Sequence, residues 1–447
     1  MRGNEIRGRK AWTVLSAVLL SIMLALTACG GGGNGKGKGK GDGGQSDGKA
    51  TPIIFWTFNE LHQQFFEHMA ELWNEQHPDK PIRLEGSTFP YDEMHNNLLL
   101  ALQSGVGAPD MVDIEISKFA NYLKGTPQLV ELNDIVEPEL SNMVKSRFDI
   151  YAKDGKYYGI DYHVGASVIY YNKEILDKAG VNPDTIKTWD DYREAGRTVV
   201  EKTGVPMATI EITDQWSFWP LIAQQGGDYL NPDGSVALDS DINIRTLQYL
   251  QDLLKEKIAV SAASGFHHSE EHYGMFNKGG AASLWMPMWY MGRFTDYMPD
   301  LKGKIIIRPM PAWTADGDRS AGMGGTGTAI TKQSKVQDIA KEFLAFAKLS
   351  RQGNIEIWRF LGFDPIRSDV WDAPEMKEPN KFTEYFGDNI FDVLIEIKDE
   401  IRGVNIGEMT PAASDAVKSQ ILVQALNDMK DPAAVLKAVS DELRKQQ

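Results

Sequence analysis

Short apolar runs alternate with stretches of helical periodicity from residue 51 onward, and this alternation constrains the fold more than any other feature. The first apolar run covers 52–56, and apolar residues then recur at helical spacing over 61–73. The same reasoning predicts strands at 82–84 and 111–116, with a helix over 91–103 between them. Strand–helix alternation of this kind is typical of an α/β fold with mostly parallel sheets.

The alternation continues to the end of the chain without an internal repeat. It predicts further strands at 157–160, 167–171 and 304–308. It predicts helices that begin near Lys173 and that cover 189–202, 214–225, 242–255, 336–349 and 414–429. A length of 447 residues suggests two to three domains.

Composition excludes several classes of protein. An apolar fraction of 42% and a charged fraction of 24% fit a globular chain, and not a disordered, collagen-like or polytopic membrane protein. The net charge of −15 argues against a nucleic-acid partner, because phosphate binding needs a basic face. The single cysteine, Cys29, rules out an internal disulfide and a cysteine-based zinc site.

The first residues have the organisation of a secretory signal. Four basic residues precede an apolar run over 11–26, which is shorter than the ~20 residues that a spanning helix needs. The run ends in Leu26-Thr27-Ala28-Cys29, which resembles the lipobox of bacterial lipoproteins, where the cysteine is acylated. We therefore expect a signal peptide at 1–28 and a lipid anchor on Cys29 that holds the protein at the extracellular face of the cell membrane. The alternative is a plain signal peptide with an incidental cysteine.

The stretch after the cleavage site cannot form a core. Gly, Lys, Asn, Asp, Gln and Ser fill it as far as Lys49, with no apolar residue. Segments of this composition remain flexible because they have little to bury. We expect residues 29–50 to be a Gly/Lys-rich tether.

Several short motifs occur in an order that is shared with one family. They are Ile54-Phe55-Trp56-Thr57-Phe58, Ala108-Pro109-Asp110, Tyr157-Tyr158-Gly159-Ile160, Tyr170-Tyr171-Asn172-Lys173, Lys187-Thr188-Trp189-Asp190-Asp191, Trp219-Pro220-Leu221-Ile222, Gly279-Gly280-Ala281-Ala282 and Ala340-Lys341-Glu342-Phe343-Leu344. In this order they resemble the extracellular solute-binding proteins of sugar-importing ABC transporters. Within that class, the stretches 160–165, 267–271 and 289–294 resemble the arabino-oligosaccharide-binding lipoproteins of Bacillus-type bacteria.

The resemblance implies a two-lobed periplasmic-binding-protein-like α/β fold with an interlobe ligand cleft and three crossing segments. We expect lobe one at 51–162 and 312–375, and lobe two at 163–311 and 376–447. The resemblance also implies a monomeric receptor that needs no cofactor or metal and is not an enzyme. Its partners would be an oligosaccharide and the transmembrane subunits of an ABC permease. Another plant-derived oligosaccharide is an alternative cargo.

Sugars offer C–H faces and a rim of hydroxyls, so aromatic plates with polar neighbours are the pattern expected in the binding site. Trp56, Asn59 and Glu60 follow the first predicted strand, and ligands of open α/β sheets bind at the carboxyl ends of strands. The competing interpretations are core packing for Trp56 and helix capping for Asn59 or Glu60. Glu115 ends the third strand, and His163 lies at the first crossing that the resemblance implies; we expect both to contact ligand.

Further expected contacts come from the resemblance. In maltose-binding relatives, an acid and an aromatic residue just before Trp-Pro-Leu-Ile contact the sugar, and Asp214 and Trp216 match them here. Trp289 and Tyr290 form an aromatic pair after an apolar strand and are expected contacts. By register, Trp285 is the alternative to Trp289 as the stacking tryptophan.

Two motifs allow competing interpretations. The run 322–327 has the spelling of a dinucleotide loop, but a strand is predicted after it where such a loop opens a helix. We expect Gly324 and Gly325 to let backbone amides approach the ligand or to line the hinge. His268, Glu271 and His272 spell the H-x-x-E-H of inverted zinc proteases, so a secreted zinc hydrolase is the alternative from another class. We favour a helix start there, with His268 as a sugar contact.

Overall fold

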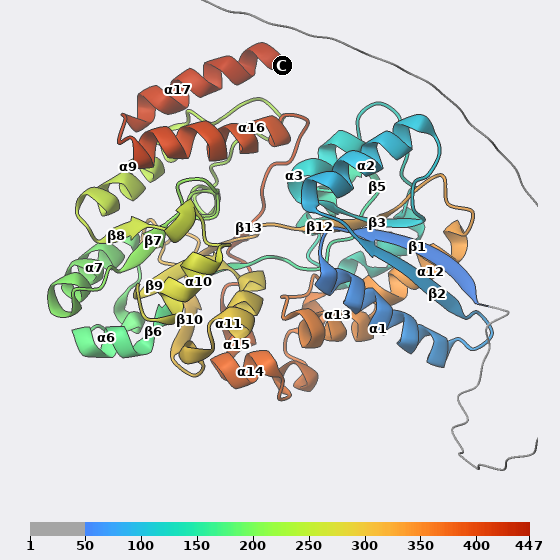
Figure 1. The fold of residues 1–447 in the computed structure, drawn as a ribbon, viewed down its shortest axis with the longest axis horizontal. Coiled ribbons are helices and arrows are strands. Elements are labelled where there is room, and N and C mark those ends of the chain that lie inside the picture. The colour runs from blue at the N-terminus through green and yellow to red at the C-terminus, as the bar shows by residue number, and fades with distance from the viewer. Residues whose placement is uncertain (1–49) are drawn as a thin grey trace, which may run out of the picture. The chain divides into compact units, whose positions relative to one another are not determined.

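The computed structural model describes residues 50–447 and contains two mixed β-sheets, each covered by helices (Figure 1). The first sheet has the strand order β12-β3-β1-β2. Its strands are β1 (Thr51–Thr57), β2 (Ile82–Thr88), β3 (Met111–Glu115) and β12 (Thr326–Ile330). β1 pairs in parallel with β2 and β3, whereas β12 joins from far along the chain and runs antiparallel to β3. We call this sheet and its helices the first lobe.

Amphipathic helices close the first lobe. Its helices are α1 (Glu60–Gln76), α2 (Tyr91–Ser104), α3 (Ile116–Phe119), α4 (Asn133–Val136), α5 (Ser146–Asp149), α12 (Gln337–Lys348) and α13 (Arg351–Glu356). The apolar face of α1, with Phe65, Phe66 and Met69, is fully buried in one core with Phe343 of α12. The expected strand over 157–160 is reduced to Lys156–Tyr157 (β5), which pairs with Ala152–Lys153 (β4).

The second sheet has the order β10-β6-β9-β7-β8 and forms the second lobe. Its strands are β6 (Ser167–Asn172), β7 (Ala208–Ile210), β8 (Ala259–Ser261), β9 (Ser283–Pro287) and β10 (Ile305–Pro309). Its helices are α6 (Lys173–Ala179), α7 (Trp189–Thr203), α8 (Trp219–Ala223), α9 (Asp241–Lys255), α10 (Glu270–Asn277), α11 (Met291–Tyr297), α14 (Lys381–Phe386), α15 (Ile390–Glu396), α16 (Thr410–Ala416) and α17 (Pro432–Leu443). A small parallel pair, β11 (Ser320–Ala321) with β13 (Ile401–Arg402), lies beside β6.

Three segments of the described chain join the lobes. The first runs from Ile160 to Ala166, which directly precedes β6. Ile160 forms a β-bridge with Thr328 of β12, and Ala166 forms one with Gly322. The second is the return path over 322–326, and the third passes Asp364, whose carboxylate accepts the N–H of Ala166 at 2.7 Å. Together they confirm the two-lobed α/β architecture expected from the sequence.

The predicted helix over 214–225 is wrong in its first half. Helical structure begins only at Trp219, with Pro220 in the first turn, where its fixed φ and missing N–H are tolerated. Upstream, the N–H groups of Trp216 and Ser217 donate to the Glu211 carboxylate instead of to helical carbonyls. These two hydrogen bonds take the place of helical ones, and the segment before Trp219 is a loop.

The lobe boundaries stay a prediction, and packing bears on where they fall. Trp313, expected in lobe one, packs edge-on against Tyr249 of α9 at 5.1 Å between ring centroids, in the core of the second sheet. Trp371 likewise packs with that lobe. These contacts favour lobe boundaries near 322–326 and before 371, in place of the expected boundaries at 312 and 375.

The predicted signal peptide, Cys29 and all but the last residue of the predicted tether lie outside the described residues. Among residues 50–447, no helix combines the length and apolar character required to cross a bilayer.

Candidate functional site

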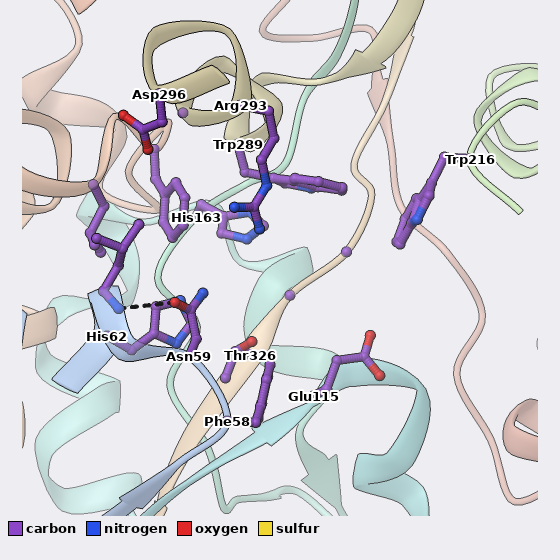
Figure 2. Close-up of a pocket in the computed structure, with 16 residues that line it drawn as sticks. Phe58, Asn59, His62, Glu115, His163, Trp216, Trp289, Arg293, Asp296 and Thr326 are labelled. Carbon is purple, nitrogen blue, oxygen red and sulfur yellow. Dashed lines mark hydrogen bonds between the residues drawn. The ribbon is translucent and has the colours of Figure 1, made fainter. Parts of the chain in front are cut away.

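A cleft lies between the two lobes at the level of the crossing segments. Side chains from both lobes and from the crossings line it: Phe58, Asn59, Leu61, His62, Glu115, His163, Trp216, Trp289, Gly292, Arg293, Asp296, Gly324, Gly325, Thr326, Leu361 and Phe363. Figure 2 shows Trp289 and Arg293 on one side of the cleft and Asn59, Phe58 and Glu115 on the opposite side.

The first-lobe wall is made by residues at strand ends. Asn59 caps α1, since its Oδ1 accepts the N–H of Leu61 at 3.0 Å, which leaves the amide nitrogen for a ligand. Glu115 caps α3, and its Oε2 accepts the hydroxyl of Tyr91 at 2.9 Å and the N–H of Ser117 at 2.9 Å. Burial raises the pKa of the Glu115 carboxyl, while these hydrogen bonds oppose the shift. Both hydrogen bonds are accepted by Oε2, so the other oxygen of Glu115, Oε1, takes part in neither.

His62 lines the same wall and is held by a buried carboxylate. Its Nδ1 lies 3.0 Å from Oδ2 of Asp113, and its ring stacks on Tyr162 with centroids 4.2 Å apart. Asp113 also accepts the hydroxyls of Tyr162 and Thr328. Burial disfavours the charged form, but His62, Lys348 and Thr328 hold the pKa of Asp113 below its usual range. Position 62 was not predicted, although its place in the first turn after β1 was the available signal.

Aromatic side chains make the second-lobe wall. The rings of Trp216 and Trp289 meet nearly perpendicular, at 78° and 5.1 Å between centroids. His268 stacks on Trp289 at 5.5 Å. The indole N–H of Trp289 donates to the carbonyl of Met323 at 3.1 Å, which fixes the ring against the second crossing. Trp285, the alternative by register, is 1% exposed and lies in the core.

Arg293 and Asp296 are cleft residues that the sequence analysis missed. Both lie on α11, at positions four and seven after Trp289, which lies in the 3-10 turn that leads directly into this helix. That spacing was the signal in the sequence. Asp296 pairs with Lys381 at 3.2 Å, whereas no carboxylate of residues 50–447 lies within the 4.0 Å pairing distance of Arg293. Arg293 therefore offers the cleft a guanidinium with free donors.

Glycines form the floor where the second crossing passes. Gly324 has φ +71° and Gly325 has φ +146°, both in the region that favours glycine. A Cβ at Gly324 would lie 2.9 Å from Nε1 of Trp289, and one at Gly325 would lie 2.5 Å from Nη2 of Arg147. β12 follows as a strand, which agrees with rejecting a dinucleotide loop. Beside them, His163 is 5% exposed, and burial lowers its pKa to about 3, so its ring is neutral.

Five predicted residues lie outside the cleft lining. Trp56 packs edge-on against Phe89, at 5.3 Å between centroids. Glu60 is exposed in the first turn of α1. Tyr290 is buried, and its hydroxyl donates to the carbonyl of His267 at 2.7 Å. The other two are Asp214 and His268, and the ring of His268 stacks on Trp289. Ligand contact by these five stays a prediction that their packing does not favour.

The zinc-protease spelling is explained by a helix start. Ser269 caps α10, since its hydroxyl accepts the N–H of His272 at 3.1 Å, and Glu270 and Glu271 form the acidic first turn. Within the described chain, the histidine and carboxylate atoms that converge to within 4.8 Å are instead those of Glu211, Asp214 and His268. The alternative interpretation of His268, Glu271 and His272 as a zinc-hydrolase triad is therefore not favoured.

Two α/β lobes around a cleft with an aromatic wall and a polar opposite face define a bilobal binding protein. The chain belongs to the family of bacterial extracellular solute-binding proteins, whose family model matches residues 59–353. It is therefore a solute-binding protein and not an enzyme.

Two relatives share half of their residues with it. The chain is 50% identical over 406 residues to the arabinooligosaccharide-binding protein of Bacillus subtilis strain 168, covering 90% of this chain and 94% of that one. It is 50% identical over 396 residues to the protein of the same name from Halalkalibacterium halodurans, covering 88% and 89%. The fold matches the GacH receptor of Streptomyces glaucescens with a TM-score of 0.71 at 21% identity, covering 89% of this chain and 98% of that one.

Proposed function

We propose that this protein is the receptor of an ABC importer for arabino-oligosaccharides. The observation that carries the proposal is the cleft between two lobes, with the perpendicular pair Trp216 and Trp289 on one side and polar side chains on the other. The 50% identity to two arabinooligosaccharide-binding proteins, over about nine tenths of the chain, supports the cargo.

The two walls suggest complementary tasks in binding. Indole faces of the second lobe would cover the C–H patches of a sugar ring, since aromatic faces combine large buried area with negative charge density. Asn59 and Glu115 of the first lobe, with Arg293 opposite, would order the hydroxyls through amide, carboxylate and guanidinium groups.

Closure of the lobes follows from this division. A ligand that touches only one wall makes only some of its contacts with the protein. The remaining contacts form when the lobes close and the second wall reaches the ligand. Ligand therefore favours the closed state by the free energy of contacts made only there.

We also propose that the receptor works at the extracellular face of the cell membrane, held by acyl chains on Cys29. The single cysteine at the end of Leu26-Thr27-Ala28-Cys29 supports this anchor. The partner would be the transmembrane subunits of an ABC permease, and the receptor would act as a monomer, with the 29–50 tether giving it reach.

Titration calorimetry against arabinan, xylan, galactan and maltodextrin fragments tests the cargo. We expect one site per chain and the tightest binding for an arabinan fragment. The matched variants are Arg293→Leu in the cleft and Arg308→Leu, whose guanidinium pairs with Asp184 at 2.6 Å on the second lobe outside it. Only the first should weaken binding. If a xylan or galactan fragment binds most tightly, the receptor role stands but the proposed cargo is wrong. If no fragment binds, the proposal is contradicted.

A further inference from the structure

A buried carboxylate lies behind the aromatic wall, and none of the proposed sugar contacts uses it. Glu211 comes directly after β7 and is 0% exposed. Its Oε2 accepts the N–H of Trp216 at 2.8 Å and of Ser217 at 3.2 Å. Its Oε1 accepts the N–H of His267 at 2.8 Å. The carboxylate thus joins its own loop to that of His267, which lies 56 positions after Glu211 in the chain.

These two loops support the aromatic wall. The first carries Trp216, which lines the cleft, and the second carries His268, whose ring stacks on Trp289. Other bonds fasten the same loops. The hydroxyl of Ser217 accepts the N–H of Glu211 at 2.9 Å, and the N–H of Ile212 donates to the carbonyl of Gly265 at 2.9 Å. The Glu211 side chain adds to these bonds the contacts to the N–H groups of Trp216 and His267, the residues within or next to the aromatic wall.

We infer that Glu211 is a positioning residue for the sugar-binding wall, and that it acts through Trp216 and not by touching the ligand. The inference rests on the proposed function, because it assigns a role to Trp216 in sugar binding. Three N–H donors converge on the two oxygens of one buried carboxyl group. Burial and the nearby charge of Asp214 raise the pKa of Glu211, and the three N–H groups oppose that shift. Glutamine fills the same volume but has one acceptor oxygen, so it cannot serve both loops.

A metal ion is the competing occupant of this region, since Glu211, Asp214 and His268 bring their ligand atoms within 4.8 Å of one another. Both oxygens of Glu211 already accept backbone N–H groups, however, and these donors oppose the rise in pKa that burial and Asp214 cause in this carboxyl group. The geometry therefore favours a carboxylate committed to the two loops.

A double-mutant cycle tests the inference. The variants are Glu211→Gln, Trp216→Ala and the combination, and the probe is the fragment from the four-class panel that wild type binds most tightly. We expect Glu211→Gln to weaken binding about tenfold. The combination should bind no more weakly than Trp216→Ala alone, because a residue that acts through Trp216 has nothing left to position.

Asp228→Asn is the matched control. Asp228 is a second buried carboxylate of the same lobe, 5% exposed, which accepts the indole N–H of Trp219 at 2.8 Å and the N–H of Tyr229 at 2.7 Å. It does not line the cleft. Its replacement should lower the melting temperature of the ligand-free protein and leave sugar affinity unchanged.

Amide hydrogen exchange in ligand-free protein provides a second arm of the test, which needs no sugar. Glu211→Gln should accelerate exchange at the N–H groups of Trp216, Ser217 and His267, and Asp228→Asn should not. This arm stays informative if the panel yields no ligand, so failure of the proposed cargo and failure of the positioning role are distinguishable. If Glu211→Gln does not fold, Glu211→Asp, which withdraws the carboxylate by one methylene, takes its place in both arms.

Three results would overturn the inference. The first is additive losses of affinity in the cycle, and the second is unchanged exchange at the three amides. The third is a stoichiometric divalent ion in purified protein whose chelation reproduces the loss of affinity, because the carboxylate would then be a metal ligand.

Discussion

Trp216 and Trp219 lie three residues apart and differ in what they contact. Trp216 is half-buried, lines the cleft and meets Trp289 edge to face. Trp219 is 1% exposed, stacks on Tyr229 at 4.9 Å and donates its indole N–H to Asp228. The burial of the two rings therefore assigns Trp216 to the cleft and Trp219 to the core of the second lobe.

Replacing each of these tryptophans by alanine should separate binding from stability. Trp216→Ala should weaken sugar binding by about 2 kcal/mol or more, which is about thirtyfold, with little change in ligand-free melting. Trp219→Ala should cost roughly 3–5 kcal/mol of folding stability through a cavity in the core. Calorimetry and thermal melting on both variants measure the two effects. A large loss of ligand-free stability in Trp216→Ala would contradict its role as a cleft plate.

Lys348 is a fully buried amine that contacts the start of the first crossing. Its Nζ lies 3.3 Å from the ring centroid of Tyr162 and donates to the carbonyl of Ile160 at 2.5 Å and the hydroxyl of Thr328 at 2.8 Å. Burial lowers the pKa of Lys348 from 10.5 to about 7, and the negative charges of Asp113 and Asp161 partly oppose this shift.

This shift predicts a pH dependence of stability. Between pH 7 and pH 10.5 the unfolded chain keeps a proton that the folded protein has released from Lys348, so this group makes the free energy of unfolding rise with pH. The slope approaches ~1.4 kcal/mol per pH unit. Denaturant melts from pH 7 to 10 should show the rise in wild type and in the exposed control Lys80→Met. Lys348→Met should lose it, and an unchanged slope in that variant would contradict the assignment.

At the scale of elements, the first two crossings are joined by a buried ion pair. Nη2 of Arg147, on α5, donates to Asp161 at 2.5 Å and to the carbonyl of Gly324 at 2.6 Å. Asp161 also accepts the hydroxyl of Tyr151 at 2.7 Å and the N–H of Thr326 at 3.1 Å. The floor of the cleft is thus held by one pair of charges, which the sequence could not indicate because Arg147 lies 177 positions before Gly324.

Breaking that pair should be costly. Arg147→Met would leave the Asp161 carboxylate buried without its cation, for which about 3–5 kcal/mol of stability is expected. Arg83→Met is the control, because Arg83 pairs with Glu85 on the surface, with side chains 62% and 45% exposed, and should lose less than about 1 kcal/mol. Equal losses in urea melts of the two variants would show that the hinge does not depend on the buried pair.

At the scale of the whole molecule, the proposed anchor and the proposed receptor belong to different parts of the chain. The lobes occupy residues after 50, whereas the predicted anchor is a single cysteine at position 29. Binding and attachment should therefore be separable.

Cys29→Ser should release the protein from the membrane without loss of sugar affinity, because acylation needs the thiol and the cleft does not. Fractionation of cells that express wild type or Cys29→Ser measures retention, and calorimetry on the released protein measures binding. Thr27→Val, which keeps the thiol, is a control that should stay attached. Membrane retention of Cys29→Ser at the wild-type level would refute the anchor.

The sequence by itself determined the α/β class, the family and most of the strands and helices that it predicted, because these depend on periodicity and on motifs that are local in the chain. The predictions over 157–160 and 214–225 failed where contacts from elsewhere in the chain replaced the local pattern. It also placed Asn59, Glu115, His163, Trp216, Trp289, Gly324 and Gly325, which lie at strand ends, crossings or loops and all line the cleft.

Only the tertiary structure decided which neighbouring aromatic faces the cleft and which lies in the core. Trp285 and Tyr290 flank Trp289 closely in the chain and are buried, because β9 and the turn after it direct them into the second lobe. Glu211 is the clearest case. Its residue type gives no sign of its task, since that task depends on N–H groups that two separate loops bring to one point, and such convergence is a property of packing in three dimensions.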